Sequence, residues 1–408
     1  MNAVAHILAV VFWVVVGLLV YSYLFYPLLL GVLARWWGRP WQMADIEPTV
    51  TLLIPAHNEA KVIGAKIQNS LSLDYPRGRL QIRVISDGSV DGTDEIVQRY
   101  AGLVEYQRIS PRGGKPNAVN QAMPYAHGEI LLLCDANTMF ARDAVHKLVR
   151  HFADPDVGAV SGDVVLTSDA VTYGRGEGLF WRMERQMQLC EALLWTTVGV
   201  DGGMYALRRE LYVPNRPDTL VDDFVIAMNV ARTGRRVVMD LEAKATEDSV
   251  SDPCQEFRRR ARTTAGGFQT LFEGRGRPGL GRPGLWLAYE SHKVLRWIGP
   301  VLLAAAFVTN AALVGVTWTA NAPGGALYAG LLAVQGVFYA LAAAGHWMRH
   351  RPLPQVLSVP YYFSLANLAA AAGFVKWLLK RQAVTWAQAD RTAPLKTVSA
   401  PVARDRAA

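Results

Sequence analysis

Short apolar runs that end in polar loops constrain the fold of this chain more than any other feature. Val50–Pro55, Gln81–Ser86 and Ile130–Leu133 each have the length and composition of one strand. Segments of helical character, Lys61–Leu71 and Asp94–Tyr100, follow the first two. Strands that alternate with helices and are buried on both faces are typical of a parallel sheet. The sequence therefore predicts an α/β fold with a parallel, doubly wound sheet.

The third apolar run ends in a pair of oxygen-bearing side chains. Asp135 follows the run Ile130–Leu133 closely, and Asn137 stands two residues later. In open α/β sheets, ligands bind at the carboxyl ends of the strands. Mg²⁺ prefers oxygen ligands and usually shares them with substrate phosphates. Two interpretations stay open: a metal-bridged nucleotide diphosphate, or a strand followed by an Asx turn.

Composition separates the middle of the chain from its ends. Of the 408 residues 51% are hydrophobic, but the apolar excess lies at both ends, and the middle has the character of one soluble domain. The net charge of +8 is explained by cytoplasmic flanks of membrane segments and by contacts to an anionic substrate, so no nucleic-acid partner is expected. The three cysteines, Cys134, Cys190 and Cys254, lack metal spacing and a disulfide framework, which fits a reducing compartment.

The N-terminal apolar run predicts a membrane anchor. Val4–Leu33 contains no charged residue and is long enough to span a bilayer. The first basic residues, Arg35 and Arg39, follow it directly. The positive-inside rule then places the N-terminus outside and the middle domain in the cytoplasm. We therefore expect a multi-pass protein of the cytoplasmic (inner) membrane.

Three further apolar segments lie near residues 298–318, 325–345 and 356–379. With three C-terminal spans the C-terminus would lie outside, and Lys380 and Arg381 would contradict the positive-inside rule. Either the last segment is re-entrant, or C-terminal charges act weakly on topology. The predicted division is a transmembrane helix over 1–35, a cytoplasmic domain over 45–272, a Gly/Arg/Pro linker with an interfacial amphipathic helix over 273–297, transmembrane helices over 298–381, and a disordered tail over 382–408.

Three local patterns each allow a functional and a purely structural interpretation. Gly113-Gly114-Lys115 opens a helix, and helix N-termini attract phosphate, although a glycine turn with an exposed lysine has the same sequence. Gly202 and Gly203 would let a sugar approach the backbone, or form an ordinary turn. The adjacent Asp222 and Asp223 would raise one another's pKa, which suits a general base, or would cap the helix that follows them.

The order and spacing of several motifs carry a family resemblance. Pro55-Ala-His-Asn-Glu59, Ser86-Asp-Gly-Ser-Val-Asp-Gly-Thr93, the Gly-Gly-Lys helix start and Leu132-Leu-Cys-Asp-Ala-Asn137 together resemble the family 2 glycosyltransferases of the GT-A (Rossmann-like) fold. The resemblance extends from about Val50 to Gln269. The flanking apolar segments are similar to those of membrane synthases of chitin oligosaccharide, poly-N-acetylglucosamine, hyaluronan and cellulose.

The resemblance implies a nucleotide-sugar donor, usually UDP-linked, and a divalent cofactor. Asp135 and Asn137 match the family's Asp-x-Asp pair, which holds Mg²⁺ or Mn²⁺; the asparagine weakens charge compensation of the metal. Asp87 would bind the base, and Lys115 would lie near the nucleotide. The remaining residues of the implied nucleotide pocket are Pro55, Ala56, Asn58 and Glu59.

On the acceptor side the resemblance makes Asp223 the catalytic base, with Asp222, Gly202 and Gly203 near the acceptor. The segment from Glu256 to Gln269 resembles the family's Gln-x-x-Arg-Trp helix, in which Arg262 matches the arginine that stabilises the leaving diphosphate. Arg259 stands where Gln is usual but is also expected near the nucleotide-sugar, and Thr263 stands where Trp is usual, which puts processivity in doubt. A literal Thr246-Glu247-Asp248 lies too close to Arg262 and is set aside. The basic cluster at residues 258–262 also fits a face that contacts lipid headgroups.

These features predict a membrane-embedded inverting glycosyltransferase that extends a β-linked polysaccharide or oligosaccharide. The alternatives are a single sugar addition to a lipid acceptor and, without turnover, a membrane-anchored scaffold that binds sugar nucleotides. Asn137 and Thr263 favour the scaffold, whereas Asp223 argues against it. Expected partners are the nucleotide-sugar donor, a carbohydrate or lipid acceptor and membrane lipids, with room for accessory export subunits.

Overall fold

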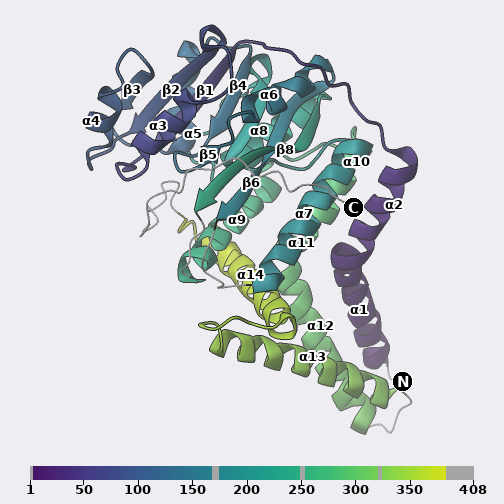
Figure 1. The fold of residues 1–408 in the computed structure, drawn as a ribbon. Helices are drawn as coiled ribbons and strands as arrows, with labels where there is room; N and C mark the ends of the chain where they lie inside the picture. The colour runs from purple at the N-terminus through teal and green to yellow at the C-terminus, as the bar shows by residue number, and fades with distance from the viewer. Residues whose placement is uncertain (1–2, 168–173, 249–252, 320–323, 383–408) are drawn as a thin grey trace, which may run out of the picture.

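The computed structural model describes residues 3–167, 174–248, 253–319 and 324–382. A sheet with helices on both faces forms one body, and long apolar helices extend from it (Figure 1). The predicted C-terminal tail begins at the last described residue, and residues 383–408 lie outside the described part of the chain.

The sheet has the strand order β3-β2-β1-β4-β7-β6-β8-β5. The first four strands of this order are parallel, as predicted. The prediction of an all-parallel sheet is wrong for the other half, because β7 and β5 run antiparallel to their neighbours. The strands are β1 (Val50–Ala56), β2 (Leu80–Asp87), β3 (Glu105–Ile109), β4 (Ile130–Cys134), β5 (Met139–Phe140), β6 (Val157–Thr167), β7 (Met204–Arg208) and β8 (Arg236–Asp248).

The reversal at β7 has a visible cause in the connection that precedes it. Between β6 and β7 the chain forms α7 (Gly174–Leu194), which packs against α2 (Tyr26–Trp37) and α14 (Gln355–Leu378). Because this helix packs mainly against the membrane-associated helices, it does not act as a crossover that returns the chain to the start of the sheet. The chain then enters β7 from the opposite end.

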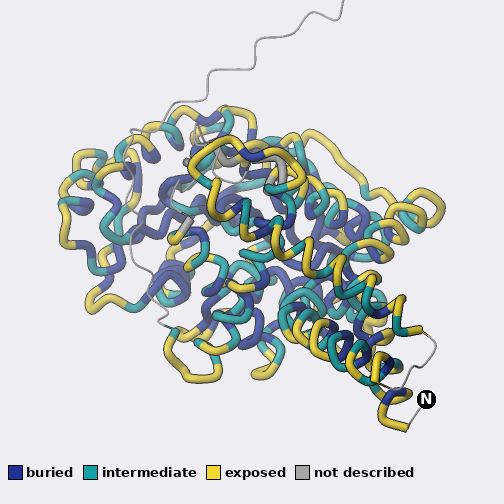
Figure 2. Tube along the Cα trace, turned by 90° about the horizontal axis from the view of Figure 1, so that it is seen from below, coloured by how far each residue is buried: buried dark blue, intermediate teal, exposed yellow. Residues whose placement is uncertain are grey.

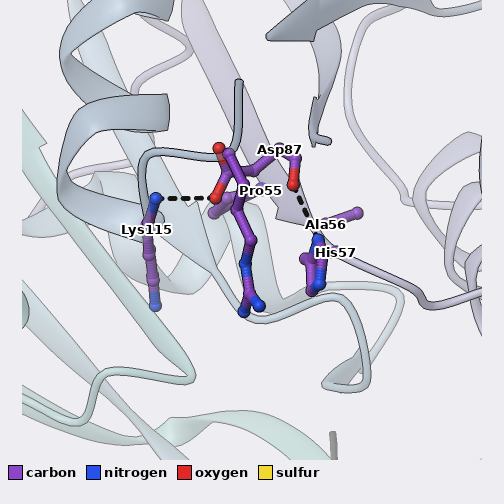
Figure 3. A pocket seen from close by; sticks show the side chains of 7 residues that line it. Pro55, Ala56, His57, Asp87 and Lys115 are labelled. Carbon is purple, nitrogen blue, oxygen red and sulfur yellow. Dashed lines mark hydrogen bonds between the residues drawn. The ribbon is translucent and has the colours of Figure 1, made fainter. Parts of the chain in front are cut away.

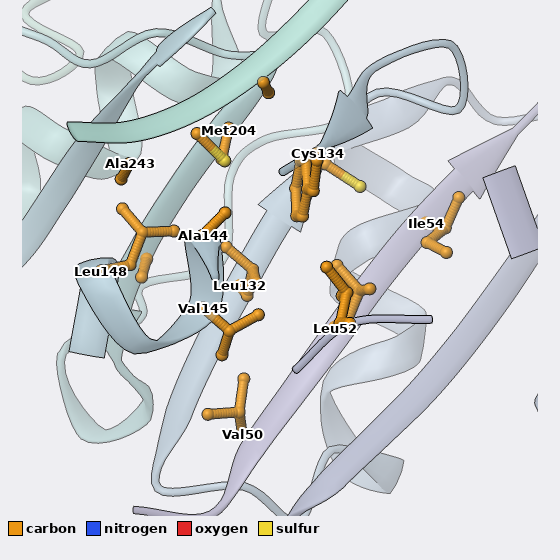
Figure 4. Packing of buried hydrophobic residues seen from close by; sticks show 14 of the residues in the cluster. Val50, Leu52, Ile54, Leu132, Cys134, Ala144, Val145, Leu148, Met204 and Ala243 are labelled. Carbon is orange, nitrogen blue, oxygen red and sulfur yellow. The ribbon is translucent and has the colours of Figure 1, made fainter. Parts of the chain in front are cut away.

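Side chains that alternate along the strands form two cores, one on each face of the sheet. On one face Leu52 and Leu132 pack with Val145 and Leu148 of α6 (Ala144–Val149) (Figure 4). On the other face Leu53 and Leu133 pack with residues of α5, α8 and α10. The remaining helices of this body are α3 (Ile63–Leu71), α4 (Thr93–Gln98), α5 (Lys115–Ala122), α8 (Asp222–Thr233), α9 (Pro253–Glu273), α10 (Pro283–Ala288) and α11 (Leu295–Trp297).

In the part of the chain that the structure describes, four helical segments are long and apolar enough to cross a membrane, one before the sheet and three after it. The first runs from Ala3 to Trp37 and comprises α1 (Ala3–Val20), a π-helical turn (Tyr21–Phe25) and α2. The others are α12 (Gly299–Thr319), α13 (Gly325–Trp347) and α14. Figure 2 shows exposed residues along much of these helices, as expected for surfaces that face lipid.

The interfacial amphipathic helix was predicted over Leu285–Trp297, and the helical segment in the structure begins two residues earlier, at Pro283. It consists of α10, a π-helical turn (Tyr289–Val294) and α11. One side of it, including Leu285 and Tyr289, belongs to the core of the sheet domain. His292 on the π-helical turn is fully buried as well. The segment is therefore held by the domain as well as by any membrane surface.

The last apolar helix differs from the other three in its surroundings. In α14, 44% of the apolar window is buried, against 11% in α13. It packs along α9 of the sheet domain, with Gly373 against Ala261 and Ala265. The rings of Phe272 and Trp377 stack with centroids 4.7 Å apart. This packing favours the re-entrant alternative, in which α14 lies between the domain and the membrane.

We therefore expect the C-terminus to lie on the same side of the membrane as the sheet domain. An α14 that follows α9 without crossing the bilayer leaves Lys380 and Arg381 on that side, in agreement with the positive-inside rule. A fluorescent reporter fused after Arg381 and an alkaline phosphatase fused at the same place measure the side directly. Phosphatase activity without fluorescence would contradict the expectation.

Candidate active site

A small cavity lies at the carboxyl ends of β1 and β2, beside the start of α5 (Figure 3). Asp87 organises it: its carboxylate oxygens accept hydrogen bonds of 2.7 Å from the backbone N–H groups of Gly113 and Gly114. Its main-chain oxygen accepts a bond of 2.6 Å from His57 Nδ1. The lining comprises Pro55, Ala56, His57, Asp87, Arg112, Gly114 and Lys115.

Four of these residues, Pro55, Ala56, Asp87 and Lys115, were predicted to bind the donor, whereas His57 and Arg112 were not. His57 lies within the Pro-Ala-His-Asn-Glu motif, so its place in the motif was a usable signal. Arg112 precedes the Gly-Gly-Lys motif directly, and a positive charge before a phosphate-binding turn was the signal there.

Asn58 and Glu59 lie beside this cavity but are not among its lining residues. Asn58 has φ +54° and accepts a bond of 2.9 Å from Val90 N–H through its side-chain oxygen. The backbone N–H of Glu59 donates to Thr93 Oγ1 over 2.8 Å. Both residues thus fix the loop after β1 to the loop after β2. Their contact with a nucleotide stays a prediction.

Lys115 connects the cavity with acidic groups at the end of β4 and at the start of α8. Its side chain is buried, and Nζ lies 2.5 Å from Asp135 Oδ1. Burial opposes the charged form, but the carboxylates of Asp135, Asp222 and Asp223 raise the pKa of Lys115. The lysine therefore stays charged, within electrostatic reach of both the predicted metal ligand and the predicted base.

Several acids gather around the predicted metal ligands. Asn137 Nδ2 donates to Glu247 Oε1 over 2.7 Å. Burial raises the pKa of Asp201 to about 7, and the charges of Glu247, Asp223 and Asp135 contribute to the rise. The hydrogen bond from the backbone N–H of Gly203 opposes it. Glu247 belongs to the Thr-Glu-Asp triplet that sequence reasoning set aside. Only the parallel pairing of β8 with β6 brings it here, and the sequence carried no signal of that pairing.

Asp135 and Asn137 fit a divalent cation that is shared with a ligand. Their oxygens lie near acids whose negative charges contribute to the raised pKa of Asp201, an arrangement that a cation would stabilise. Among the described residues, no group of three or more His, Cys, Asp or Glu side chains is arranged to hold a metal ion by itself. Substrate phosphates would have to complete such a site.

Asp223 lies in the first turn of α8, where its Oδ1 accepts the N–H of Phe224 over 2.8 Å. Burial and the charge of neighbouring Asp222 raise the pKa of Asp223 to about 6, while Lys115 and the Phe224 bond oppose this rise. Asp222 is buried, and its Oδ2 has no hydrogen-bond partner within the described residues. Asp222 thus acts on its neighbour through charge, and its contact with an acceptor stays a prediction.

The two predicted acceptor glycines lie next to the predicted base. A Cβ atom added to Gly202 would lie 2.3 Å from Asp223 Oδ2, so the carboxylate rests against the glycine backbone. A Cβ atom on Gly203 would lie 3.1 Å from both Thr138 Oγ1 and Val164 Cγ2. At Gly202 the absence of a side chain is what permits the close approach of Asp223.

The arginines of α9 have different surroundings. Arg262 donates to the main-chain oxygen of Leu220 over 3.0 Å, just before Asp222. Arg259 is held by Glu256 through bonds of 2.8 and 3.0 Å; burial opposes its charge, but Glu256 and then Glu247 raise its pKa. Thr263, at the position of the family's tryptophan, is exposed. Contact of either arginine with a diphosphate stays a prediction.

Loops that are far apart in the sequence thus converge at one edge of the sheet. Asp87 holds the loop that carries Lys115, Lys115 pairs with Asp135, and its charge reaches Asp223. Gly202 lies against Asp223, and Arg262 holds the loop before it. A cationic side chain thus lies between the cavity at the ends of β1 and β2 and a carboxylate of raised pKa.

Comparison with known proteins agrees with this geometry. Residues 51–213 match the family described as Glycosyl transferase family 2. The protein contains a family 2 glycosyltransferase domain. The match covers β1 to β7 and ends before Asp223 and Arg262, so the assignment of these two residues rests on motif spacing and on the contacts above.

Two curated relatives illustrate the range of the family. Beta-monoglucosyldiacylglycerol synthase of Synechocystis sp. is 27% identical over 235 residues, which are 55% of this chain and 49% of the relative. Poly-beta-1,6-N-acetyl-D-glucosamine synthase of Staphylococcus aureus is 29% identical over 129 residues, 31% of each chain. The chain spans about half the length, or less, of the curated relatives that it matches.

The fold is that of the GT-A glycosyltransferases. A mannosyltransferase from Pyrobaculum calidifontis, solved in complex with GDP-Man and Mn²⁺, superposes with a TM-score of 0.67. The superposition covers 91% of this chain and all of the solved chain, at 24% sequence identity. The predicted fold class, a GT-A domain with one apolar helix before it and three after it, is confirmed.

Proposed function

We propose that this protein is a membrane-associated, inverting glycosyltransferase that moves a sugar from a nucleotide diphosphate, expected to be UDP, to an acceptor hydroxyl. The observation that carries the proposal is the position of Asp223. Its pKa is raised to about 6, and it lies against Gly202, within the electrostatic reach of Lys115. A base with a pKa of about 6 is mostly ionised at neutral pH and still accepts a proton readily.

The chemistry follows from these side chains. Asp223 takes the proton of the acceptor hydroxyl while the acceptor oxygen forms a bond to the anomeric carbon of the donor. The bond from that carbon to the diphosphate oxygen breaks on the opposite face, which inverts the configuration. Lys115 and Arg262 are the cations expected to balance the charge of the departing diphosphate. Arg259 donates both of its hydrogen bonds described above to Glu256, so we assign it only a supporting role in this charge balance.

A divalent cation, Mg²⁺ or Mn²⁺, would be held by Asp135 and Asn137 together with the donor phosphates. Such a cation supplies charge neutralisation at the diphosphate. The structurally similar mannosyltransferase was solved with Mn²⁺, which supports a divalent metal without choosing between the two ions.

A lipid is the acceptor class that the packing of α9 on α14 supports best. This contact holds the helix of Arg262 directly against an apolar helix, so the acceptor side of the site lies at the membrane surface. Similarity to a glucosyldiacylglycerol synthase agrees with it. The second candidate is elongation of a polysaccharide, which similarity to a poly-N-acetylglucosamine synthase supports. We propose the cytoplasmic side of the inner membrane for the domain, from Arg35 and Arg39.

The test offers the purified full-length protein in detergent a panel of UDP- and GDP-sugars with lipid extract, and measures released nucleotide and labelled product. One donor should give metal-dependent nucleotide release and a single lipid product. A ladder of products would favour the polysaccharide candidate instead. Binding of a donor without release above background would overturn the proposal and favour a binding scaffold.

The transfer rate is expected to fall below about pH 6. Only ionised Asp223 accepts a proton, and its pKa lies at about 6 because burial and Asp222 disfavour the charged form. Below this pH the rate should drop about tenfold per pH unit. The measurement is a single-turnover pH–rate profile at saturating donor. A flat profile down to pH 4.5 would exclude Asp223 as the base.

Gly202→Ala is expected to lower kcat about a hundredfold, as a displacement of a catalytic group by about 1 Å does. The added methyl group would collide with Asp223 Oδ2, so the carboxylate must move. Gly203→Ala is the matched control, because its nearest contacts are longer and do not include Asp223. Steady-state kinetics of both variants separate the effects. Equal losses would mean that the loop as a whole, not the approach to Asp223, matters.

A further inference from the structure

A second cavity, of about 300 Å³, lies away from the donor pocket, between the end of α2 and the end of α7. Its lining residues are Leu33, Trp37, Arg39, Leu194 and Trp195, and we name it the Trp195 cleft. The helices pack tightly below it through Tyr26, Leu30, Met187 and Cys190. The cleft opens where this packing ends, so its apolar wall continues the contact between the two helices.

The cleft lies near the polar boundary of the membrane. The helix from Ala3 to Trp37 has 35 residues, which is about 52 Å at 1.5 Å per residue. The hydrocarbon core of a bilayer is about 30 Å thick, and the headgroups bring the total to about 45 Å. Near its end Trp36 and Trp37 are 73% and 66% exposed, and Arg35 beside them is exposed as well. Tryptophans at such a level are typical of the headgroup region.

Arg39, the charged residue that lines the cleft, has no ionic partner among the described residues. Within the described residues the side chains of Arg35 and Arg39 make no ion pair or hydrogen bond. Arg236 lies beside them and donates to the main-chain oxygens of Arg39 and Ala192 over 2.7 and 2.6 Å. Burial lowers the pKa of Arg236; the charges of Asp154 and Asp156 oppose this shift, and the charge of Arg39 adds to it. An anion at the cleft would relieve this local excess of positive charge.

We propose that the Trp195 cleft binds an anionic phospholipid from the membrane. The phosphate lies at Arg39, and the glycerol and upper acyl chain lie along Leu33 and Leu194, between the rings of Trp37 and Trp195. The combination of one cation with four apolar side chains fits a headgroup joined to a chain, and fits a free phosphate poorly. The site is separate from the donor pocket, and the inference does not depend on the proposed function.

A lipid bound in the Trp195 cleft would also affect the position of the loop that leads to the acceptor side of the domain. Leu194 ends α7, and the chain after Trp195 continues through residues 196–201 to Gly202, which lies against Asp223. The ring of Trp195 packs on Gly284, where a Cβ atom would lie 2.5 Å from it. A lipid in the cleft would therefore fix the end of α7 and the start of that loop.

Native mass spectrometry of delipidated full-length protein tests the inference. Phosphatidylglycerol and phosphatidylcholine with the same acyl chains are titrated, and wild type should retain the anionic lipid about fivefold better, as one arginine near a headgroup provides. Arg39→Gln should abolish this preference. Arg351→Gln is the matched control, since Arg351 is an exposed arginine that follows α13. Equal losses in both variants would indicate unspecific attraction and overturn the site.

Two further experiments distinguish a lipid phosphate from a free phosphate and check that a variant of the cleft still folds. Leu194→Trp should fill the cleft and reduce retention of both lipids, while its melting temperature verifies that it folds. Glycerol 3-phosphate, which carries the phosphate without chains, should bind wild type at least tenfold more weakly than phosphatidylglycerol. Comparable binding of the two would overturn a lipid site, and so would equal retention of the two lipids by wild type.

Discussion

Asp223→Asn is expected to lower the rate of sugar transfer about 10³-fold, the usual contribution of a general base. The substitution removes the proton acceptor but keeps an oxygen that can accept the N–H of Phe224, as Oδ1 of Asp223 does. The contact with Gly202 also keeps its shape. Binding of the donor should therefore persist while turnover is lost. Single-turnover transfer and donor binding, measured on the same preparation, report the two properties separately.

Asp222→Asn is the matched control for this prediction. Asp222 adds negative charge next to Asp223 and thereby raises the pKa of Asp223. Its removal should leave most of the activity and shift the acid limb of the pH–rate profile to lower pH. If wild type and Asp223→Asn release nucleotide at the same background rate, the protein is a scaffold that binds sugar nucleotides. If Asp222→Asn loses as much as Asp223→Asn, the identity of the base is wrong.

The donor half of the fold could be predicted because its signals are local. Three of the four parallel strands of this half, β1, β2 and β4, are mainly apolar runs, and the functional residues stand at or just after the strand ends, as Asp87 ends β2 and Asp135 follows β4. The carboxyl ends of neighbouring parallel strands meet at one sheet edge. The resemblance supplied the order of the motifs, and the structure brings their side chains together.

The second half could not be predicted in the same way, because long-range pairings determine it. Alternation of strand and helix says nothing about the direction of β7, which depends on α7 packing outside the sheet. Glu247 reaches Asn137 only because β8 pairs with β6, far apart in sequence. The position of α14 depends on its contact with α9, which hydropathy along one segment does not register.

A buried polar network links the first apolar helix to the sheet domain, and sequence reasoning gave no sign of it. His292 is fully buried, with Nδ1 2.9 Å from Glu191 Oε1 and Nε2 2.9 Å from Glu184 Oε1. Since carboxylate oxygens only accept, the ring carries a proton on both nitrogens and is positively charged. Tyr26 of α2 donates to Glu191 over 2.8 Å. Burial opposes ionisation of Glu184, but His292, Lys293 and Arg296 hold its pKa well below its usual value.

His292→Ala is expected to destabilise the protein by about 3–5 kcal/mol, because removing one partner leaves buried charge uncompensated. The loss of charge compensation is largest at Glu191, since its side chain is fully buried and His292 is its cationic partner. Glu184 keeps its ion pairs with Lys293 and Arg296. Denaturant unfolding in detergent, followed by tryptophan fluorescence, measures the change. His127→Ala, an exposed histidine of the sheet domain, should change stability by less than about 0.5 kcal/mol.

A second substitution distinguishes charge from packing in this network. If the uncompensated carboxylate causes the loss, Glu191→Gln introduced into His292→Ala should restore part of the stability, because the amide removes the buried negative charge and can still accept from Tyr26. A cavity alone would give a double variant no more stable than His292→Ala. Partial recovery would establish that the first apolar helix, through Tyr26, and the sheet domain are joined by a charge-balanced contact whose members depend on one another.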